Sequence, residues 1–266
     1  MTEITQPLLA ADEPLPVSVY NAGGASPLLL VADHAGNATP RALGRLGVAA
    51  LEWERHIAWD IGIAGVGRML ADALGAMLIQ QNYSRLVIDC NRPPGAPTSI
   101  PEISELTPIP GNVALSEAEK EARARAIFWP YHGRIKTELD HRRQAGRATA
   151  LIALHSFTPV FKGVARAWQV ALLYNRDPSL AHRLLVLLRQ EPGIVVGDNQ
   201  PYFVSDTTDY TIPMHGERRG LPHALIEIRQ DLIAEASGQR KWAGILARLL
   251  PQAYADLSAS NPTGPA

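Results

Sequence analysis

The fold is decided by Pro27-Leu-Leu-Leu-Val-Ala-Asp-His34, an apolar run that ends abruptly in groups able to hold a metal. Three further stretches share this design: Arg85-Leu-Val-Ile-Asp-Cys-Asn-Arg92, Ala150-Leu-Ile-Ala-Leu-His-Ser156 and Ala224-Leu-Ile-Glu-Ile-Arg229. Each apolar part is too short for a buried helix and suits a buried strand. In open α/β sheets, ligands bind beyond the carboxyl ends of the strands. The four stretches therefore predict one polar site on an apolar sheet, which is typical of a hydrolytic enzyme that uses a metal.

The composition limits the class of protein. The chain has 266 residues, 46% of them hydrophobic, and its 25 basic and 26 acidic residues give a net charge of −1. This length suits one large α/β domain or two small ones, and it allows a substantial core. The balanced charge argues against general binding to nucleic acid or anionic membranes, and no apolar run is long enough to span a bilayer. We expect neither a nucleic-acid partner nor a membrane partner.

The single cysteine and the two ends indicate where the protein works. Cys90 cannot form an internal disulfide and suits a reducing cytoplasm. Its strand-like setting favours a buried structural thiol over a nucleophile. Residues 1–16 lack the basic-then-apolar order of a secretory signal. We expect a cytoplasmic protein with a single catalytic domain at 17–257 and flexible ends at 1–16 and 258–266.

Strand and helix patterns alternate along the chain, which indicates an α/β protein with helices on both faces of the sheet. Strands are expected at 27–33, 85–89, 149–155, 168–174, 194–196 and 223–228. Helices are expected from about Asp60 through Met77, from a capping box at 116–119 towards Gly146 with a kink at Pro130, from 177 to 190, and near the C-terminus. The segments 93–113 and 198–222 read as long loops.

His34 and His155 both end predicted strands, and two imidazoles at matching positions favour a metal site over a structural role. A catalytic zinc ion usually has three protein ligands and keeps one position for water. Asp60 is the candidate third ligand; it could instead be a helix N-cap, and His56 could replace it as ligand. Asp33 starts on the opposite face from His34, which suits an acceptor that orients an imidazole. We expect Zn²⁺ or another divalent transition metal here.

Glu227 is the candidate general base. It ends an apolar run, where partial burial would raise its pKa towards neutral pH. It could then take a proton from water and deliver it to a leaving amine. The alternative is a structural carboxylate paired with Arg229 or another arginine, because buried carboxylates are usually paired.

Several cationic side chains border the predicted strand ends. A guanidinium group binds a carboxylate through two parallel hydrogen bonds, so a group of arginines indicates a small anionic substrate, such as a dicarboxylate. His215, in the loop 198–222, could donate to the substrate or be an ordinary solvated residue. The candidate substrate-binding residues are Arg85, Asn91, Arg92, Arg166, His215 and Arg229.

Six stretches, in order along nearly the whole chain, resemble the N-formylglutamate amidohydrolase family: Val31-Ala-Asp-His-Ala-Gly-Asn37, His56-Ile-Ala-Trp-Asp-Ile-Gly62, Asn82-Tyr-Ser-Arg-Leu-Val-Ile-Asp-Cys-Asn-Arg92, His155-Ser-Phe-Thr-Pro159, Gly197-Asp-Asn-Gln-Pro-Tyr202 and Ile226-Glu-Ile-Arg-Gln-Asp231. The resemblance implies a three-layer α/β/α sandwich with a mixed, largely parallel central sheet, as in zinc exopeptidases and peptidoglycan amidases. It also implies that His34, Asp60 and His155 hold zinc and that Glu227 is the base.

Two departures mark the chain as a divergent branch of that family. The acidic ligand of the wider group is usually glutamate, whereas this chain has Asp60. Members associated with histidine degradation carry a Ser-x-Pro-His-x-Gly motif, whereas this chain has Ala32-Asp-His-Ala-Gly36.

The resemblance implies metal-dependent hydrolysis of the amide bond of an N-acyl amino acid, such as N-formyl-L-glutamate, to release formate and the amino acid. One alternative is an amidase of peptide or cell-wall fragments, which predicts an open groove and an export signal. Another alternative is a catalytically silent protein that binds acyl amino acids on the same scaffold. The oligomeric state stays open.

Overall fold

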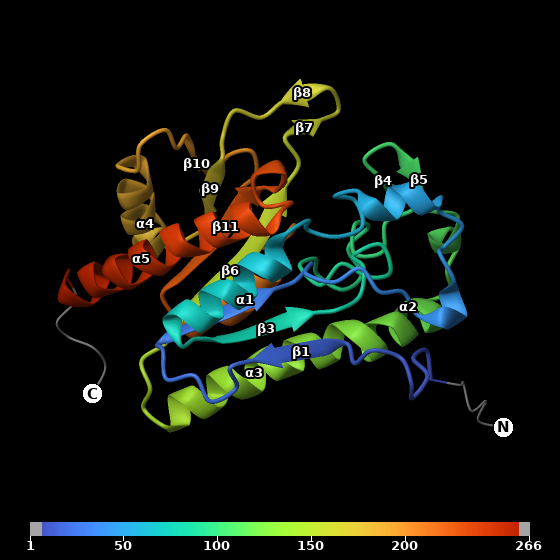
Figure 1. Cartoon of the computed structure of the whole chain (residues 1–266). Helices are drawn as coiled ribbons and strands as arrows, with labels where there is room; N and C mark the ends of the chain where they lie inside the picture. The colour runs from blue at the N-terminus through green and yellow to red at the C-terminus, as the bar shows by residue number, and fades with distance from the viewer. Residues whose placement is uncertain (1–6, 261–266) are drawn as a thin grey trace.

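Seven strands form one mixed sheet within residues 7–260, the part of the chain that the computed structural model describes (Figure 1). Its centre is parallel and runs in the order β3 (Met77–Gln81), β2 (Leu28–Ala32), β6 (Ala150–Phe157) and β11 (His223–Arg229). The outer strands are β1 (Val17–Tyr20), antiparallel to β3, then β9 (Val170–Leu173), antiparallel to β11, and β10 (Val196–Asp198), parallel to β9. The predicted mixed, largely parallel sheet is confirmed.

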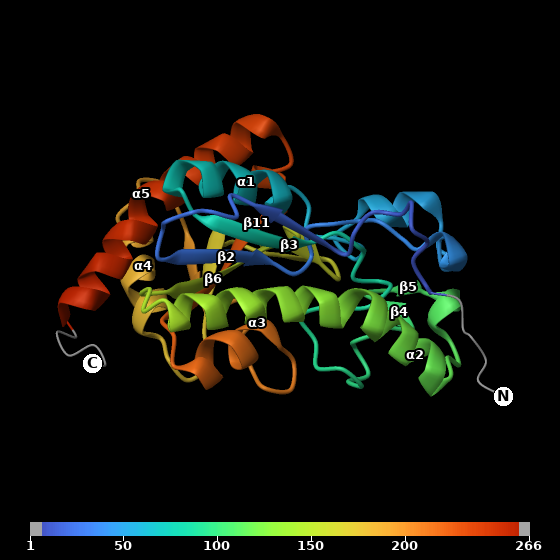
Figure 2. The same cartoon turned by 90° about the horizontal axis from the view of Figure 1, so that it is seen from below.

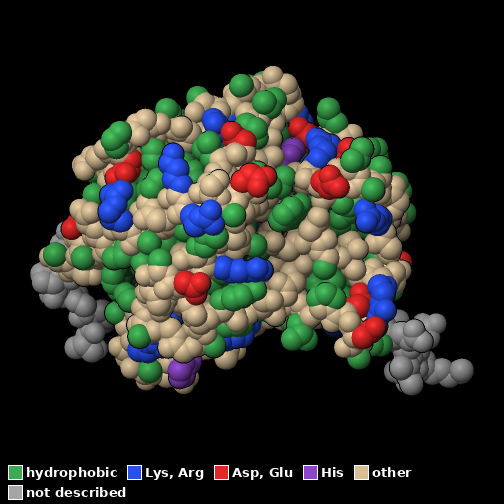
Figure 3. Space-filling view, viewed as in Figure 1, with side chains coloured by type: hydrophobic (Ala, Val, Ile, Leu, Met, Phe, Trp, Pro, Cys, Tyr) green, Lys and Arg blue, Asp and Glu red, His purple; other side chains and the backbone are tan. Residues whose placement is uncertain are grey.

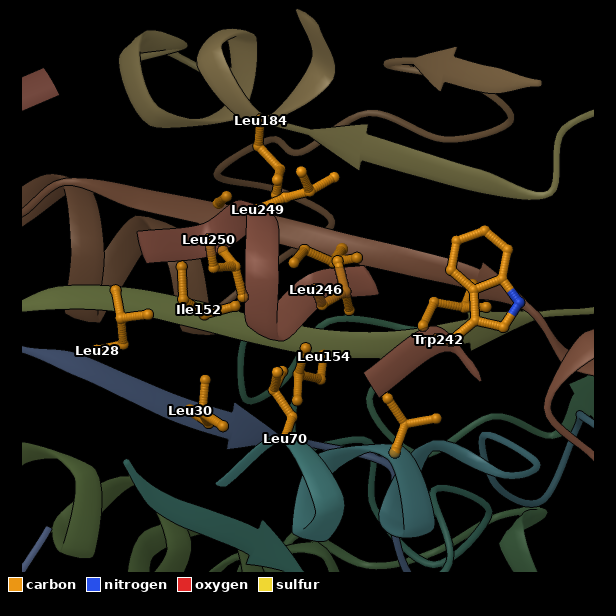
Figure 4. Close-up of a cluster of buried hydrophobic side chains, with 14 of the residues drawn as sticks. Leu28, Leu30, Leu70, Ile152, Leu154, Leu184, Trp242, Leu246, Leu249 and Leu250 are labelled. Atoms are coloured by element: carbon orange, nitrogen blue, oxygen red, sulfur yellow. The ribbon is translucent and has the colours of Figure 1, made fainter. Parts of the chain in front are cut away.

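Helices cover both faces of this sheet (Figure 2). One face packs against α1 (Ile63–Leu74), α4 (Ser179–Arg189) and α5 (Ala236–Ser260), and the other packs against α3 (Trp129–Gln144). Side chains alternate between the faces along each strand. Leu30 therefore belongs to the cluster with Leu70 and Leu246 (Figure 4), whereas Val31 belongs to the cluster with Ile135. The predicted three-layer α/β/α sandwich is confirmed.

The prediction of a strand at 85–89 is wrong, and so is the extension of the first helix through Met77. The helix α1 ends at Leu74 because Gly75 adopts a left-handed conformation, with φ of 56°, and its N–H group bonds back to the last turn. The chain then turns into β3 between β1 and β2. The apolar run 86–88 is buried as an irregular turn, so burial without strand pairing produced the false signal.

The long helical segment after residue 116 begins as predicted. Ser116 Oγ accepts a hydrogen bond from the backbone N–H of Glu119, and the Glu119 carboxylate accepts one from the N–H of Ser116, which completes the capping box. The helix α2 (Glu117–Arg123) continues through a π-helical turn at Ala124–Phe128 into α3. That turn directly precedes Pro130, where the sequence predicts a kink because proline has no N–H to donate.

The other predicted elements are present with shifted ends. The strands expected at 149–155, 168–174, 194–196 and 223–228 are β6, β9, β10 and β11. The Asp177 carboxylate accepts a hydrogen bond from the backbone N–H of Ser179, the first residue of α4, although the N-cap position itself is occupied by Pro178. The strand β1 was not predicted, although the alternation in Val17-Ser-Val-Tyr20 is its signal.

Two short hairpins and several helical turns interrupt the loops. The predicted loop 93–113 contains β4 (Ile103–Ser104) and β5 (Thr107–Pro108). A second hairpin, β7 (Val160–Phe161) with β8 (Val164–Ala165), directly follows β6 (Figure 1). The predicted loop 198–222 contains a π-helical turn, Ile212–Gly216, and a 3₁₀ turn, Glu217–Arg219.

Parts of the expected flexible ends belong to the folded body. The Tyr83 hydroxyl donates to the carbonyl of Pro14, and the helix α5 extends to Ser260, past the expected boundary at 257. The expectation for 1–6 and 261–266 lies outside the described residues. None of the helices within 7–260 combines the length and apolarity that crossing a bilayer requires.

Candidate active site

The carboxyl ends of β2, β6 and β11 meet at one edge of the sheet, because these three strands are parallel neighbours. His34 lies two residues past the end of β2. His155 lies two residues before the end of β6, and Glu227 lies two residues before the end of β11. His155 and Glu227 are register partners, so their side chains leave the sheet side by side on the same face. The fold thus brings together residues that are distant in sequence.

Three buried side chains form a cluster with the geometry of a metal site. The ligand atoms that His34, Asp60 and His155 offer lie within 4.8 Å of one another. Asp60 Oδ2 is 3.5 Å from His34 Nδ1 and 3.0 Å from His155 Nδ1. Two ligands bound about 2.0 Å from a tetrahedral zinc ion are separated by about 3.3 Å, so both distances suit a shared metal.

Each imidazole is oriented from its other ring nitrogen by a buried aspartate. His34 Nε2 lies 2.7 Å from Asp89 Oδ1, and His155 Nε2 lies 3.0 Å from Asp33 Oδ2. A carboxylate at Nε2 keeps the proton there and leaves Nδ1 free to bind a metal. Asp33 lies where the sequence predicted an orienting acceptor. The matching role of Asp89 was not predicted, because no spacing pattern connects it with His34.

Asp60 does not cap a helix. The helix α1 begins at Ile63 after Gly62, and no side chain caps its first turn. The Asp60 carboxylate instead accepts a hydrogen bond from the backbone N–H of Ser156, and its own N–H donates to the carbonyl of His34. These two bonds hold the short aspartate side chain against both β2 and β6. It reaches the two histidines although it is one methylene shorter than glutamate.

His56, the alternative ligand, lies outside the cluster of three side chains that could hold a metal within residues 7–260. Its Nε2 is 3.6 Å from the carboxylate of Glu105 in the β4–β5 hairpin, and its ring packs against Phe161. Burial lowers the pKa of His56, which favours a neutral imidazole. The geometry therefore favours Asp60 as the third ligand.

The carboxylates of the cluster are held in their ionised form. Burial alone would raise the pKa of Asp33, but the hydrogen bond from His155 lowers it to about 2. The pKa of Asp60 is likewise lowered, since the two imidazoles outweigh its burial. Burial lowers the pKa of His155, but the two aspartates that flank it raise that pKa well above its usual value. In the absence of a metal, a protonated His155 between the ionised Asp33 and Asp60 therefore stabilises the cluster.

The pKa of Glu227 is shifted in the opposite direction from the pKa values of Asp33 and Asp60. Burial raises its pKa to about 7, which the positive charge of His155 only partly offsets. Its Oε2 is buried and has no hydrogen-bond partner among the described residues. Arg229 does not pair with Glu227, because its guanidinium binds Asp231. The structural-pair interpretation of Glu227 with Arg229 is therefore wrong.

A cavity of about 510 Å³ opens over this cluster. Its lining includes the three candidate metal ligands, Glu227 and the candidate substrate-binding residues Arg85, Asn91 and Arg92. Arg85 Nη2 donates to Asp89 Oδ2 at 2.7 Å, and Asn91 Nδ2 donates to Asp209 Oδ1 at 2.9 Å. On this side of the molecule, Figure 3 shows a histidine (purple) among acidic and basic side chains between the two hairpins.

The structure does not bring the other three candidates into the cavity lining. Arg166 packs against the rings of Phe161 and Tyr202 behind the wall. Arg229 donates to Asp231 and to the carbonyl of Arg166. His215 is buried in the π-helical turn, where its Nε2 lies 3.0 Å from His132 Nδ1, and burial lowers its pKa to about 3.

Several lining residues were not predicted as part of the site. Tyr202, Phe203 and Asp209 come from the loop 198–222, and Glu105 comes from the β4–β5 hairpin. The signals were the lengths of the two loops, since loops of this size in a compact domain are usually functional, and the family resemblance of the stretch that ends at Tyr202. Which of their side chains face the cavity depends on how the loops pack, and no sequence periodicity encodes that.

Comparison with known proteins agrees with this architecture. The family model of N-formylglutamate amidohydrolase matches residues 26–234. A gene product of Agrobacterium tumefaciens of known crystal structure is similar, with a TM-score of 0.91 and 37% identity over 94% of this chain and 99% of that one. The N-formylglutamate amidohydrolase of Ralstonia eutropha is similar in fold, with a TM-score of 0.64 and 20% identity over 91% of this chain and 98% of that one.

A search of curated protein sequences finds no match to the chain. The family assignment therefore depends on the family model, which matches well over half of the residues and includes every stretch that forms the site. The chain belongs to the N-formylglutamate amidohydrolase family, a family of enzymes that hydrolyse amides.

Proposed function

We propose that this protein is a metal-dependent hydrolase of N-acyl amino acids, with N-formyl-L-glutamate as the reference substrate of its family. The family membership supports amide hydrolysis, and the cavity of about 510 Å³ suits a small molecule better than a cell-wall polymer. The single buried cysteine, Cys90, supports a cytoplasmic location. The observation that carries the proposal is the His34–Asp60–His155 cluster beside an unpaired, buried Glu227.

The residues of the cluster fit a divalent transition metal such as Zn²⁺. His34 Nδ1 is buried without a hydrogen-bond partner, which is costly unless a ligand such as a metal completes the site. Two imidazole nitrogens and one carboxylate oxygen are a common donor set of catalytic zinc sites. A metal held by these residues would polarise the amide carbonyl and lower the pKa of a coordinated water molecule.

Glu227 would then act as the proton carrier. Its carboxyl group lies beside His155, and its raised pKa places it near the pH at which a general base works best. Glu227 takes the proton from the attacking water and passes it to the amine that leaves. One water molecule is consumed, the C–N bond breaks, and the acyl acid and the free amino acid are the products.

Asn91, Arg92 and Arg85 are the proposed contacts to the substrate. All three line the cavity next to the cluster. Arg85 also holds Asp60 and Asp89, at 3.4 Å and 2.7 Å, so it links substrate binding to the geometry of the ligands. The positions of Arg166, Arg229 and His215 give them a supporting role in the wall rather than direct contact.

The test is a hydrolysis assay on metal-loaded protein with N-formyl and N-acetyl amino acids, N-formyl-L-glutamate among them. We expect release of the free amino acid, loss of turnover with a chelator, and recovery when Zn²⁺ is restored. A protein that binds these compounds without hydrolysing them in the metal-loaded state would instead be the silent binding protein, and the proposal would be wrong.

A further inference from the structure

The arginines that line the cavity already face carboxylates of the protein. Arg85 lies between Asp60 and Asp89. Arg92 Nη1 is 3.9 Å from Asp209 and also donates to the carbonyl of Thr208. Within the described residues, neither guanidinium of the lining is therefore left without an acidic neighbour. One substrate carboxylate can share these groups, but a second would compete with the aspartates that position the site.

Arg166 and Arg229, which could have bound a second carboxylate of the substrate, contact other groups of the protein instead. Arg166 is stacked between Phe161 and Tyr202, with its guanidinium carbon 4.8 Å and 4.7 Å from the two ring centres. Arg229 binds Asp231 at 2.8 Å. Neither arginine lines the cavity. The wall near them is formed by aromatic faces, so the charge is covered rather than presented to a ligand.

Large apolar and aromatic side chains line the mouth of the cavity, beside polar groups such as His56 and Glu105. Ile103 of β4 and Phe203 of the loop 198–222 line it, yet they are 64% and 66% exposed. Phe161 of β7 and Tyr202 complete the same rim. Large apolar side chains that line a cavity and still face solvent contribute nothing to the core of the protein. Such surfaces mark places where an apolar group of a ligand binds.

A hydrogen bond joins the two hairpins that contribute to the rim. The backbone N–H of Lys162, at the tip of the β7–β8 hairpin, donates to Glu105 Oε1 of the β4–β5 hairpin at 3.3 Å. Glu105 is held in place by Arg55 and lies beside His56. The two hairpins in Figure 1 are thereby joined across the opening. This contact holds the hairpins that carry Ile103 and Phe161 next to each other.

We propose that the substrate carries one carboxylate and an apolar or aromatic side chain, and that Ile103, Phe161 and Phe203 select it. This inference rests on the proposed function and names its substrate class. The carboxylate lies near Arg92 and Asn91, and the side chain points outward into the rim, where it loses contact with water. A glutamyl side chain would place its second charge against Ile103 and Phe203. Among the described residues, both arginines of the lining already face carboxylates, and Lys162, with Nζ 5.6 Å from the centre of the Phe161 ring, does not line the cavity.

The test compares three substrates on zinc-loaded protein: N-formyl-L-phenylalanine, N-formylglycine and N-formyl-L-glutamate. We expect kcat/KM for the phenylalanine compound to exceed that for the glycine compound by on the order of tenfold, which corresponds to about 1.4 kcal/mol. The glutamate compound should be no better than the glycine compound. A preference for glutamate would overturn the inference and leave the proposed function intact. Failure to hydrolyse all three would overturn both.

Variants of the rim give a second measurement. In Phe203→Ser and in Ile103→Ser, the ratio of kcat/KM for N-formyl-L-phenylalanine to that for N-formylglycine should fall several-fold. Phe203→Arg should raise the relative kcat/KM for N-formyl-L-glutamate. Val186→Ser, at an exposed position of α4 outside the cavity, is the matched control and should leave all three values unchanged. An unchanged ratio in both serine variants would exclude the rim as the selecting surface.

Discussion

Two carboxyl groups in this site have opposite protonation tendencies, although both are buried. Asp60 faces two imidazoles and Arg85, which keep it ionised. Glu227 has no hydrogen bond on Oε2, so burial dominates and raises its pKa to about 7. Acid and base roles in enzymes are assigned by such differences in environment. One carboxylate is thus prepared to bind a cation and the other to exchange a proton.

Replacing Glu227 by glutamine tests its role as base. The amide keeps the shape of the side chain but cannot accept the proton, so we expect kcat to fall at least about 100-fold. Metal content, measured by elemental analysis, should stay the same, because Glu227 is not a proposed ligand. Wild-type turnover in Glu227→Gln would remove the residue from the mechanism.

The same variant has a pH-dependent effect on the stability of the metal-free protein. The pKa of Glu227 rises from 4.5 to about 7 on burial, so the folded state binds the proton more tightly than the unfolded chain between these values. Wild-type stability should fall as the pH rises through this range. Glu227→Gln avoids that loss and should be more stable than wild type at about pH 8, by on the order of 3 kcal/mol at most. Thermal unfolding at about pH 4 and pH 8 measures this, and an equal difference at both values would contradict it.

Asp33 is expected to act on the metal through His155. Asp33 Oδ1 also accepts a hydrogen bond from Thr211, which fixes the carboxylate under the imidazole. We expect Asp33→Asn to weaken metal affinity by about 10- to 100-fold, as for other partners that orient a ligand. Competition with a metal indicator dye measures it. Asp72→Asn, at a surface hydrogen bond to Asn21, is the control.

At the scale of elements, one glycine connects the first helix to the site. Gly62, with φ of 81°, precedes α1 and follows Asp60 closely. A Cβ atom there would lie 2.1 Å from the carbonyl oxygen of Ile233. The close approach of these two backbones is what places the Asp60 segment against the strand ends.

Gly62→Ala should therefore destabilise the fold by on the order of 3 kcal/mol or more, because left-handed strain and a backbone clash add together. Gly75→Ala is the matched control. Gly75 also has a positive φ, of 56°, but a Cβ there meets nothing within 4 Å. That variant should cost about 1–2 kcal/mol, from the backbone conformation alone. Similar unfolding midpoints for both variants in denaturant would show that the contact with Ile233 can relax.

Most elements could be predicted from the sequence, and the error at 85–89 has a physical origin. Short apolar runs show that a segment is buried, but they do not show that it is paired in a sheet. Met77–Gln81 contains two glutamines, which hid a strand that is fully buried. The His34, His155 and Glu227 positions were predictable because parallel strands end at one edge. The role of Asp89 was not, because it reaches His34 across 55 residues from an irregular turn.

For the whole molecule, a metal would tie together three distant parts of the chain. His34 follows β2, Asp60 precedes α1, and His155 belongs to β6. An ion that binds only the folded state raises its stability, by about 2.7 kcal/mol when the free ion is 100-fold above its Kd. We expect a chelator to lower the unfolding temperature of the metal-loaded protein. His155→Ala protein, prepared in the same way, should show a much smaller response. Equal unfolding temperatures of wild type with and without chelator would contradict a metal at this site.

The amino-acid sequence by itself determined the α/β class, the alternation of strands and helices, and the strand ends that carry His34, His155 and Glu227. Hydrophobic periodicity and local capping are sufficient for these features, because they depend on neighbours in the chain. Only the tertiary structure decided that Asp89 orients His34, that Asp33 orients His155 rather than its neighbour His34, that Arg166 and Arg229 lie outside the cavity, and that large apolar side chains line its mouth. Those outcomes depend on how loops from separate parts of the chain pack against one another, and side-chain contacts across such distances follow no sequence period.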